Sequence, residues 1–445
     1  MAIIFAEGFD HYGTIQYNTT PGVDFGEELS DSQSRYNMLS GVWAEVPLTA
    51  KVYYENDDIG GYPFRPRTGR GSLGFANSGT GSVHLRRTLF AQKGTGGEYV
   101  GCAFAVWMGQ LPVEGDKQVL ISFLDSRSYP NIAFLLQPDG TVSVRVPVKW
   151  GSPSTNDWIG GLTPGSNPYG STEIASSPVG AFVAGTWNHI EVKVAIGTAG
   201  GGNPGKVYMK INEESMISLS GVNTIGTYST GTETSASNDA YVSQVSFLFN
   251  SGTEGNQLPI FLDDIVCWDS TGSYNTDFIG DKNVVLEQLM FDYGDDATLA
   301  NGWGVVGAAG IKEAIDDFND PDIWTDNPDY PDPPYDTPYY NGRDEDSYLV
   351  AAAVNDTVEL RTDVPTTLTS IAAIVLVNSL RKTQASTTKV QASFVNSGGT
   401  PVAGTDRPVA QDFTYYQDVL ERDPAGAVWT PTTLNAGKVR IKRTT

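Results

Sequence analysis

The run Gly185-Thr-Trp-Asn-His-Ile-Glu-Val-Lys-Val194 decides the fold class of this chain. After a turn at the glycine, apolar side chains return at every second position, at Ile190, Val192 and Val194. This alternation is typical of a half-buried β-strand. The glycine-rich stretch 197–205 predicts a turn, and the alternation resumes over residues 206–212. The two strands are therefore predicted to form a β-hairpin.

The composition of the whole chain favours the same kind of structure. With 445 residues, the chain is long enough for two or three domains, each with its own core. A hydrophobic content of 40% is that of a globular protein, and 49 glycines and 25 prolines indicate many turns. Pro138-Asp-Gly140 is one such turn. We expect an all-β protein, with further alternating strands at 99–107, 118–124, 132–137, 141–148, 242–249 and 260–268.

A polar, turn-rich segment at 270–282 predicts a boundary between two domains. We expect one domain in residues 1–275, with insertions at 151–180 and 220–239, and a second β-sandwich in residues 276–445. In the second domain we expect a short helix at 310–318 and strands at 284–291, 347–360, 370–380, 388–395 and 411–420. Thr432 or Thr433 is expected to cap one helical turn near the end of the chain.

An acidic, proline-rich segment lies at about 322–346. Its prolines exclude a helix and favour extended backbone. Its carboxylates repel one another, so the segment does not collapse by itself. We expect an extended arm that lies outside both cores and orders against a neighbouring surface, such as a basic patch.

Charge, hydrophobicity and cysteine content narrow the possible partners. The formal net charge is −24, and we expect no nucleic acid partner because phosphate binding needs a basic surface. No apolar run approaches about 18 residues, so we expect no membrane insertion. Residues 1–10 lack the basic start of a signal peptide, so we expect folding in the cytosol. Cys102 and Cys267 are too few for a disulfide framework and are expected to be buried thiols.

Three pieces of the first half resemble the later strands of the concanavalin A-like (laminin G-like) jelly roll. They are the run that begins at Gly185, the strand Lys206-Val-Tyr-Met-Lys-Ile-Asn212, and Phe261-Leu-Asp-Asp-Ile265. The resemblance implies a lectin-type sandwich, a fold that binds sugars, builds shells or cuts glycans.

The second half resembles the C-terminal part of a group of tailed-bacteriophage virion structural proteins. Those proteins often carry a laminin G-like domain in front of it. The matching pieces occur in order at 263–281, Asn301-Gly-Trp303, Asp346-Ser-Tyr-Leu-Val350, 370–382 and Val428-Trp-Thr-Pro-Thr-Thr-Leu-Asn-Ala436. Two insertions, at 151–180 and around 322–340, depart from the usual pattern and put the local binding surfaces in doubt.

We predict no catalytic site. Jelly-roll glycosidases carry two glutamates on one strand as E-x-D-x-x-E, so that both carboxylates face the sugar. Neither Asp344-Glu-Asp346 nor Asn212-Glu-Glu214 has that spacing. We expect His189 to be a structural residue of its strand. We also expect no cofactor, although Asp125 is a candidate Ca²⁺ ligand because lectin sandwiches often bind this ion in loops.

Aromatic and basic residues are the candidates for interfaces or glycan binding. Aromatic residues anchor interfaces, so some of them either pack against a neighbouring subunit or stack on sugar rings: Trp150, Trp158, Tyr169, Tyr330, Tyr335, Tyr339 and Tyr340. A basic cluster either docks an acidic segment of a neighbour or is a solvated face: Arg65, Arg67 and Arg70, with Arg86 and Arg87.

The sequence therefore predicts a non-catalytic structural component of a bacteriophage virion, assembled in the host cytoplasm. We expect it on the surface of the tail or capsid, as a homo-oligomer that also contacts other virion proteins. The main alternative is a tail adhesin that binds a host-surface glycan. A glycoside hydrolase is a more distant alternative.

Overall fold

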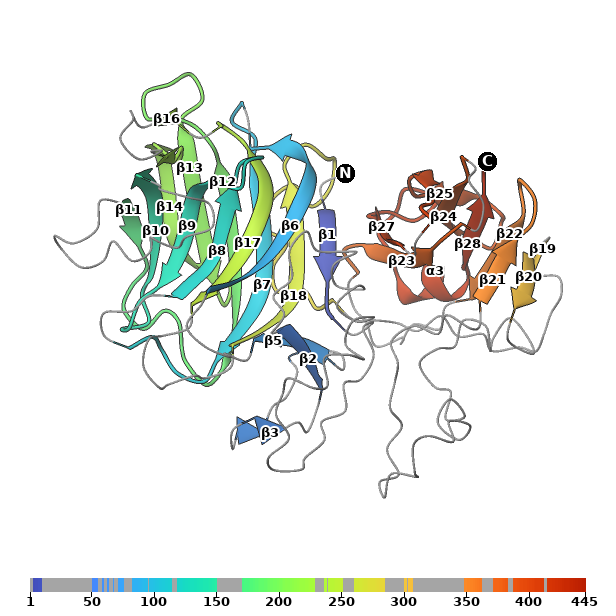
Figure 1. Cartoon of the computed structure of the whole chain (residues 1–445), viewed down its shortest axis with the longest axis horizontal. Helices are drawn as coiled ribbons and strands as arrows, with labels where there is room; N and C mark the ends of the chain where they lie inside the picture. Colours follow the sequence, from blue (N-terminus) through green and yellow to red (C-terminus); the bar gives the residue numbers. More distant parts are fainter. Residues whose placement is uncertain are drawn as a thin grey trace. The chain divides into compact units, whose positions relative to one another are not determined.

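The chain is described by a computed structural model over residues 3–9, 50–54, 58–59, 62–63, 67, 71–75, 82–94, 96–113, 118–149, 170–228, 236–237, 239–250, 260–284, 300–301, 303–306, 348–361, 371–382, 387–411 and 414–445. These residues divide into a first unit that ends at Val284 and a second unit that follows it. Apart from one helical turn, the regular structure of the described residues is all β-strand (Figure 1). The all-β prediction is confirmed. No helix in the described part is long and apolar enough to cross a membrane.

The first unit is a sandwich of two antiparallel sheets. The first sheet, called sheet A, has eight strands in the order β14-β13-β12-β7-β18-β5-β2, and β1 also pairs with β18. Its strands are β1 (Ile3–Glu7), β2 (Ala50–Tyr54), β5 (Gly71–Phe75), β7 (Val100–Met108), β12 (Trp187–Ala195), β13 (Gly205–Ile211), β14 (Glu214–Val222) and β18 (Ile260–Asp269).

The second sheet, called sheet B, has six strands in the order β11-β10-β9-β8-β17-β6. Its strands are β6 (Ser82–Lys93), β8 (Gln118–Leu124), β9 (Pro130–Leu136), β10 (Val142–Lys149), β11 (Gly170–Ser176) and β17 (Val242–Asn250). Two short pairs accompany the sheets: β3 (Asp58–Ile59) with β4 (Tyr62–Pro63), and β15 (Thr227–Tyr228) with β16 (Ala236–Ser237).

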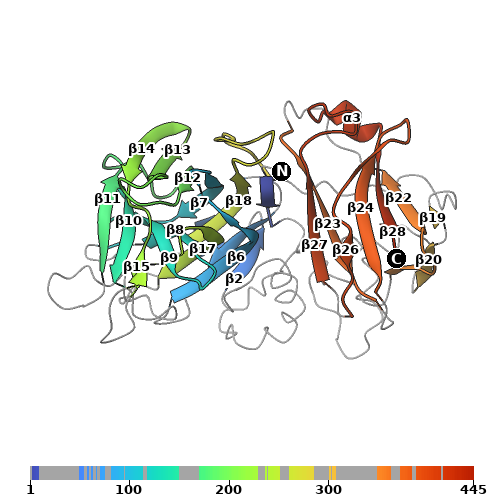
Figure 2. The ribbon, with the colours of Figure 1, turned by 90° about the horizontal axis from the view of Figure 1, so that it is seen from above.

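The core of the first unit lies between the two sheets, which form two layers in Figure 2. Phe104 of sheet A meets Phe247 of sheet B edge to face, with ring centroids 5.0 Å apart. Ile190, Val192 and Val194 are fully buried, as their alternation predicts. The chain crosses repeatedly from one sheet to the other, which gives the jelly-roll type of sandwich expected from the sequence.

Two glycines are needed for this packing. Gly140 has a φ of +78° in the predicted turn between β9 and β10, where a side chain is strained. Gly101 lies beside Trp268, and a Cβ atom at residue 101 would lie 2.3 Å from the indole ring. The absence of a side chain at Gly101 therefore makes room for a fully buried tryptophan on the neighbouring strand.

The segment expected to be a linker packs onto the first unit. The backbone N–H groups of Ile279 and Gly280 both donate to Oε1 of Glu191, at 2.8 and 3.0 Å. The division between the two units falls after Val284 and not at residue 275. We call residues 277–284 the strap, because they cross β12 on the face that points away from the core.

Several expected elements lie wholly or mostly outside the described residues. These are the strand at 284–291, of which only Val284 is described, the helix at 310–318 and the acidic arm at 322–346. The expected insertion at 151–180 includes β11, so this part is a strand of sheet B and not a loop.

The second unit is also built from antiparallel strands. One sheet has six strands, in the order β19-β22-β28-β24-β25 with β26 also paired to β24, and separate pairs join β20 to β21 and β23 to β27. The strands are β19 (Ala300–Asn301), β20 (Trp303–Val306), β21 (Tyr348–Ala351), β22 (Thr357–Arg361), β23 (Ile374–Leu380), β24 (Lys389–Val395), β25 (Pro401–Ala403), β26 (Arg407–Pro408), β27 (Thr414–Leu420) and β28 (Lys438–Arg443).

Trp429 is at the centre of the second core. Its ring meets Phe394 edge to face at 5.0 Å, and its Nε1 donates to the carbonyl oxygen of Leu420 at 2.6 Å. The helical turn α3 (Pro431–Asn435) follows directly. Its N-cap is Thr430, while Thr433 closes a capping box from the third helical position. The helical turn is confirmed, but neither Thr432 nor Thr433 is its N-cap.

Candidate functional site

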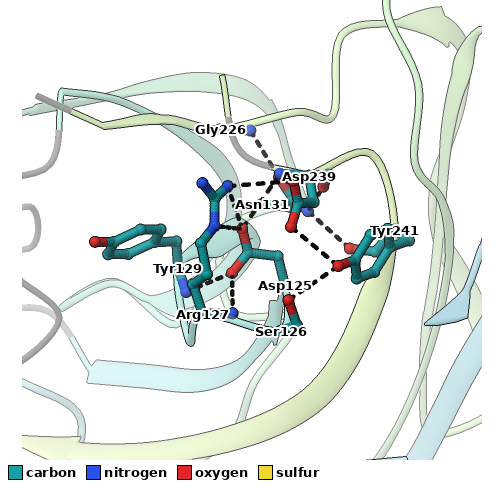
Figure 3. A network of polar contacts seen from close by, with 8 residues as sticks. All are labelled: Asp125, Ser126, Arg127, Tyr129, Asn131, Gly226, Asp239 and Tyr241. Atoms are coloured by element: carbon teal, nitrogen blue, oxygen red, sulfur yellow. Dashed lines mark hydrogen bonds and ion pairs between the residues drawn. The ribbon is translucent and has the colours of Figure 1, made fainter. Parts of the chain in front are cut away.

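A network of polar side chains joins the turn between β8 and β9 to Gly226, Asp239 and Tyr241 at one end of the sandwich (Figure 3). Asp125 directly follows β8, and its N–H donates to the carbonyl oxygen of Tyr129 at 2.9 Å. Ser128 has a φ of +66°, which lets the chain reverse within this short turn. The turn therefore places Asp125, Arg127 and Tyr129 close together before β9 begins.

The carboxylate of Asp125 is fully buried and accepts five hydrogen bonds. Its Oδ1 accepts from the backbone N–H groups of Arg127 and Tyr129, at 2.8 and 3.0 Å. Its Oδ2 accepts from the guanidinium of Arg127 at 2.8 and 3.1 Å and from the N–H of Asp239 at 3.2 Å. The positive charge beside this candidate calcium ligand is thus supplied by Arg127.

Asn131, which is also fully buried, holds the opposite side of the network. Its Nδ2 donates to the carbonyl oxygens of Asp239 and Tyr241, at 2.8 and 3.0 Å, and its Oδ1 accepts from the N–H of Gly226 at 3.1 Å. Asn131 is three positions before the core residue Phe134, so it lies on the face of β9 that points away from the core. The backbone at Gly226, Asp239 and Tyr241 is therefore fastened to the outer face of sheet B.

The exposed side of the network combines an aromatic ring with polar groups. The guanidinium of Arg127 lies 5.2 Å from the ring centre of Tyr129 and 3.5 Å from Asp239. The hydroxyl of Tyr241 bonds with Ser126 at 2.9 Å and donates to Asp239 at 3.0 Å. The side chains of Arg127 and Asp239 are 38% and 39% exposed. Such a surface offers hydrogen-bond donors, acceptors and one apolar face to a polar ligand.

A second polar cluster lies beneath the strap. His189 is buried, and neither ring nitrogen has a hydrogen-bond partner among the described residues. Burial lowers the pKa of His189 to about 4, although the carboxylate of Asp281, 4.0 Å away, favours the charged form. Burial also raises the pKa of Glu191, although the two strap amides favour its charged form.

The two ends of the strap are held by charged residues. Lys193 pairs with Asp277 and lies over the rings of Tyr208 and Phe278, at 4.9 and 4.5 Å. At the other end, the N–H of Val284 donates to Oδ1 of Asp264 at 2.6 Å. The charged residues of this second cluster hold the backbone of the strap in place, so their role is structural.

Only part of the predicted site is described. Arg67 donates to Asp264 at 2.8 Å and also pairs with Asp281, so its charge is matched within its own unit. Arg87 is buried over the ring of Phe5, at 4.5 Å. These two arginines are not part of a solvated face. Arg86 is half-buried and donates from Nη1 to Oγ of Ser128 at 2.9 Å. The remaining candidates lie outside the described residues: Arg65, Arg70, Trp150, Trp158, Tyr169, Tyr330, Tyr335, Tyr339 and Tyr340.

Sequence reasoning singled out Asp125 but not Arg127, Asn131, Asp239 or Tyr241. The available signal was the local sequence Asp125-Ser-Arg-Ser-Tyr129 between two strands, because an aspartate at the start of a tight turn often accepts from the following backbone N–H groups. Asn131 and Asp239 are far apart in the sequence, and no local pattern joins them. Among the described residues, no group of three or more His, Cys, Asp or Glu side chains is placed to hold a metal ion.

No protein-family model matches the chain, and no curated protein matches it. Among solved structures, it is similar to the binding domain of botulinum neurotoxin serotype D, with 10% identity over 49% of this chain and 42% of that chain, at a TM-score of 0.27. It is similar to a carbohydrate esterase from the Shiga toxin-encoding bacteriophage phi24B, with 13% identity over 49% of this chain and 86% of that chain, at 0.27.

The Emp46p carbohydrate recognition domain, in its potassium-bound form, is similar with 8% identity over 49% of this chain and 88% of that chain, at a TM-score of 0.28. The matched part spans less than half of the serotype D domain and of the similar binding domain of botulinum neurotoxin DC, at 42% and 43% of their lengths. At these identities and TM-scores, none of the similarities assigns an activity to the chain.

Proposed function

We propose that the chain is a non-catalytic structural component of a bacteriophage virion. It lies on the surface of the tail or capsid and assembles with copies of itself and with other virion proteins in the host cytoplasm. The order of the sequence pieces in the second half that resemble virion proteins supports this proposal. Two units with separate cores also suit a protein that makes more than one contact in a particle.

The buried carboxylates form their hydrogen bonds and ion pairs within the protein, and this observation best supports a non-catalytic role. Asp125 holds a turn and the segment that follows β16, Asp264 holds the end of the strap, and Asp269 holds Lys93 and Thr271. A glycosidase needs a pair of carboxyl groups that face an open site. The carboxylates named here instead bind groups of the protein itself.

The edge of sheet A supports the proposed assembly. Among the described strands, β14 pairs only with β13, and its residues are exposed or half-buried except for Ile217, which is buried. An edge strand of this kind can pair with another chain. Homo-oligomerisation through this edge is consistent with the proposed place in a particle.

A density map of the intact phage particle tests this proposal, with mass spectrometry of purified particles as a second measurement. We expect the chain in both, at a defined position. Absence from purified particles would overturn the virion role. Release of reducing sugar ends from host polysaccharide by the purified protein would overturn the non-catalytic role and favour the hydrolase alternative.

The second candidate function is binding of a host-surface glycan by the first unit. The exposed side of the network in Figure 3 favours it, because Tyr129 offers a ring and Arg127 and Asp239 offer hydrogen-bonding groups. A glycan array tests this with the wild-type chain, Tyr129→Ala and the control Tyr274→Ala, which changes an exposed tyrosine near the strap. Binding lost only in Tyr129→Ala supports the site, and no binding by the wild type rejects it.

A further inference from the structure

The two cysteines of the chain are direct partners on neighbouring strands. Cys102 lies on β7 and Cys267 on β18, and the register of the two strands places them opposite each other. They are the only cysteines among 445 residues. A residue in a sheet has at most two directly paired neighbours, so two cysteines placed independently rarely become partners. They are separated by 165 positions in the sequence, and only the fold brings them together.

The geometry of the pair suits a disulfide. The two Sγ atoms lie 3.5 Å apart, and both residues are fully buried. Directly paired residues of antiparallel strands have Cα atoms about 4.5–5.5 Å apart, which falls within the range of about 4.4–6.8 Å for disulfides. The bonded sulfurs must approach to about 2.05 Å, and rotation about the two Cα–Cβ bonds can provide this movement.

The surrounding register is regular. The bulge in β18 lies between Asp263 and Val266, and pairing then continues without a break through Cys267 and Trp268 to Asp269. Cys102 is also paired with Val192 on its other side, and Cys267 with Phe5. Both cysteines therefore belong to inner strands, which are held on both sides and do not need to move apart or together for the bond to form.

We propose that Cys102 and Cys267 are a disulfide site, which is reduced in the cytosol and closes when the chain folds in an oxidising medium. The oxidant is a low-molecular-weight disulfide. One cysteine thiolate attacks it, forms a mixed disulfide and releases one small thiol. The second thiolate then attacks the protein sulfur of that mixed disulfide and releases the second small thiol. The two cysteines are oxidised, the small disulfide is reduced to two thiols, and the protons of the cysteines pass to those thiols.

Burial determines when this reaction takes place. It raises the pKa of the Cys102 thiol well above its ordinary value, and a protonated thiol is a poor nucleophile. The folded sandwich also gives a small disulfide no access to either sulfur, because both side chains are fully buried. The bond therefore forms during folding, or when β7 and β18 open, and not by direct attack on the folded protein.

Refolding of the full chain from denaturant tests the proposal. One sample refolds with a phosphine reductant and another with a mixture of oxidised and reduced glutathione. In the glutathione sample, we expect a monomer in which neither cysteine reacts with an alkylating agent after unfolding. We also expect one peptide pair linked through residues 102 and 267. The bond restricts the unfolded chain, so one unfolding transition should move to higher denaturant and return after reduction.

Matched variants separate the bond from other effects of the glutathione buffer. Cys102→Ala and the double variant Cys102→Ala with Cys267→Ala should show the same unfolding transition in both buffers. If these variants do not fold, the comparison between reduced and oxidised wild-type chain still decides the question. Two free thiols in the oxidised wild type, or a linked chain with a lower unfolding midpoint than the reduced chain, would overturn the proposal.

Discussion

The backbone N–H of Val284 donates a hydrogen bond to Oδ1 of Asp264 at 2.6 Å. Asp264 is fully buried within the bulge of β18, and its φ of +51° turns its backbone out of the regular strand. The last residue of the first unit is therefore bonded to the middle of sheet A, and the segment expected to be a linker completes the first unit.

This contact predicts that a fragment of residues 1–284 is more stable than a fragment of residues 1–275. The shorter fragment loses the amide donors to Glu191 and Asp264 and leaves two buried carboxylates with fewer partners. A buried polar group without its partner costs about 1–3 kcal/mol. We expect a lower melting temperature for the shorter fragment. Equal melting temperatures would show that the strap contributes nothing to the first unit.

Acid should destabilise the first unit through His189. Burial lowers the pKa of this residue from 6.5 in a free chain to about 4. The unfolded state therefore binds the proton first, and stability is lost as the pH falls from about 6.5 towards 4. The full loss corresponds to about 3 kcal/mol. Denaturant unfolding at several pH values measures the slope.

The variant His189→Gln should flatten this slope, because glutamine does not titrate. The wild-type chain in the same buffers is the reference for this comparison. The Asp281 carboxylate favours the charged histidine and Arg67 opposes it, so in Asp281→Asn the loss of stability through His189 should continue to a lower pH. An unchanged slope in His189→Gln would assign the acid sensitivity to other groups.

Asn131→Ala should loosen the segment 239–241, together with Gly226, from sheet B. The substitution removes three hydrogen bonds from a fully buried position. At about 1 kcal/mol each, the expected loss of stability is about 2–3 kcal/mol. Limited proteolysis should cleave this segment sooner than in the wild type. The control is Asn223→Ala. The Asn223 side chain is exposed and, within the described part of the chain, forms hydrogen bonds with the backbone of nearby Ile225, so this variant should behave as the wild type.

Calcium should leave the melting temperature of the chain unchanged. Both carboxylate oxygens of Asp125 already accept from N–H donors, including the guanidinium of Arg127. A Ca²⁺ ion at this position would have to displace that guanidinium. Melting curves with added Ca²⁺ and with a chelator measure the effect. A rise with Ca²⁺ that disappears in Asp125→Asn would identify a calcium site after all.

Glu213→Gly should stabilise the hairpin of β13 and β14. Asn212 and Glu213 form its two-residue turn, with φ values of +49° and +68°. Turns of this type favour glycine at the second position, and a non-glycine residue in this conformation costs on the order of 1 kcal/mol. We expect a gain of up to about 1 kcal/mol in the free energy of unfolding. Asn212→Gly is a poor alternative, because it would remove Oδ1 of Asn212, which accepts a hydrogen bond from the backbone N–H of His189 at 2.9 Å.

The strands of the first unit were predictable because alternation is a local property. The strand at 118–124 and the start of β12 at Trp187 were located to the residue. The strap was not predictable, since its polar composition is that of a linker. Its place on the first unit is set by hydrogen bonds to Glu191 and Asp264, which are distant in the sequence. The loop network was predictable only at Asp125, where one turn contains both the acceptor and two of its donors.

The close approach of Gly101 and Trp268 connects two positions of the sequence that must change together. Any side chain at residue 101 occupies the space of the indole ring, so a relative with a larger residue there needs a smaller one at position 268. In an alignment of relatives, this pair should vary as a unit: glycine opposite a large aromatic residue, or two residues of intermediate size. The pairing of β7 with β18 would then be readable from sequence variation alone.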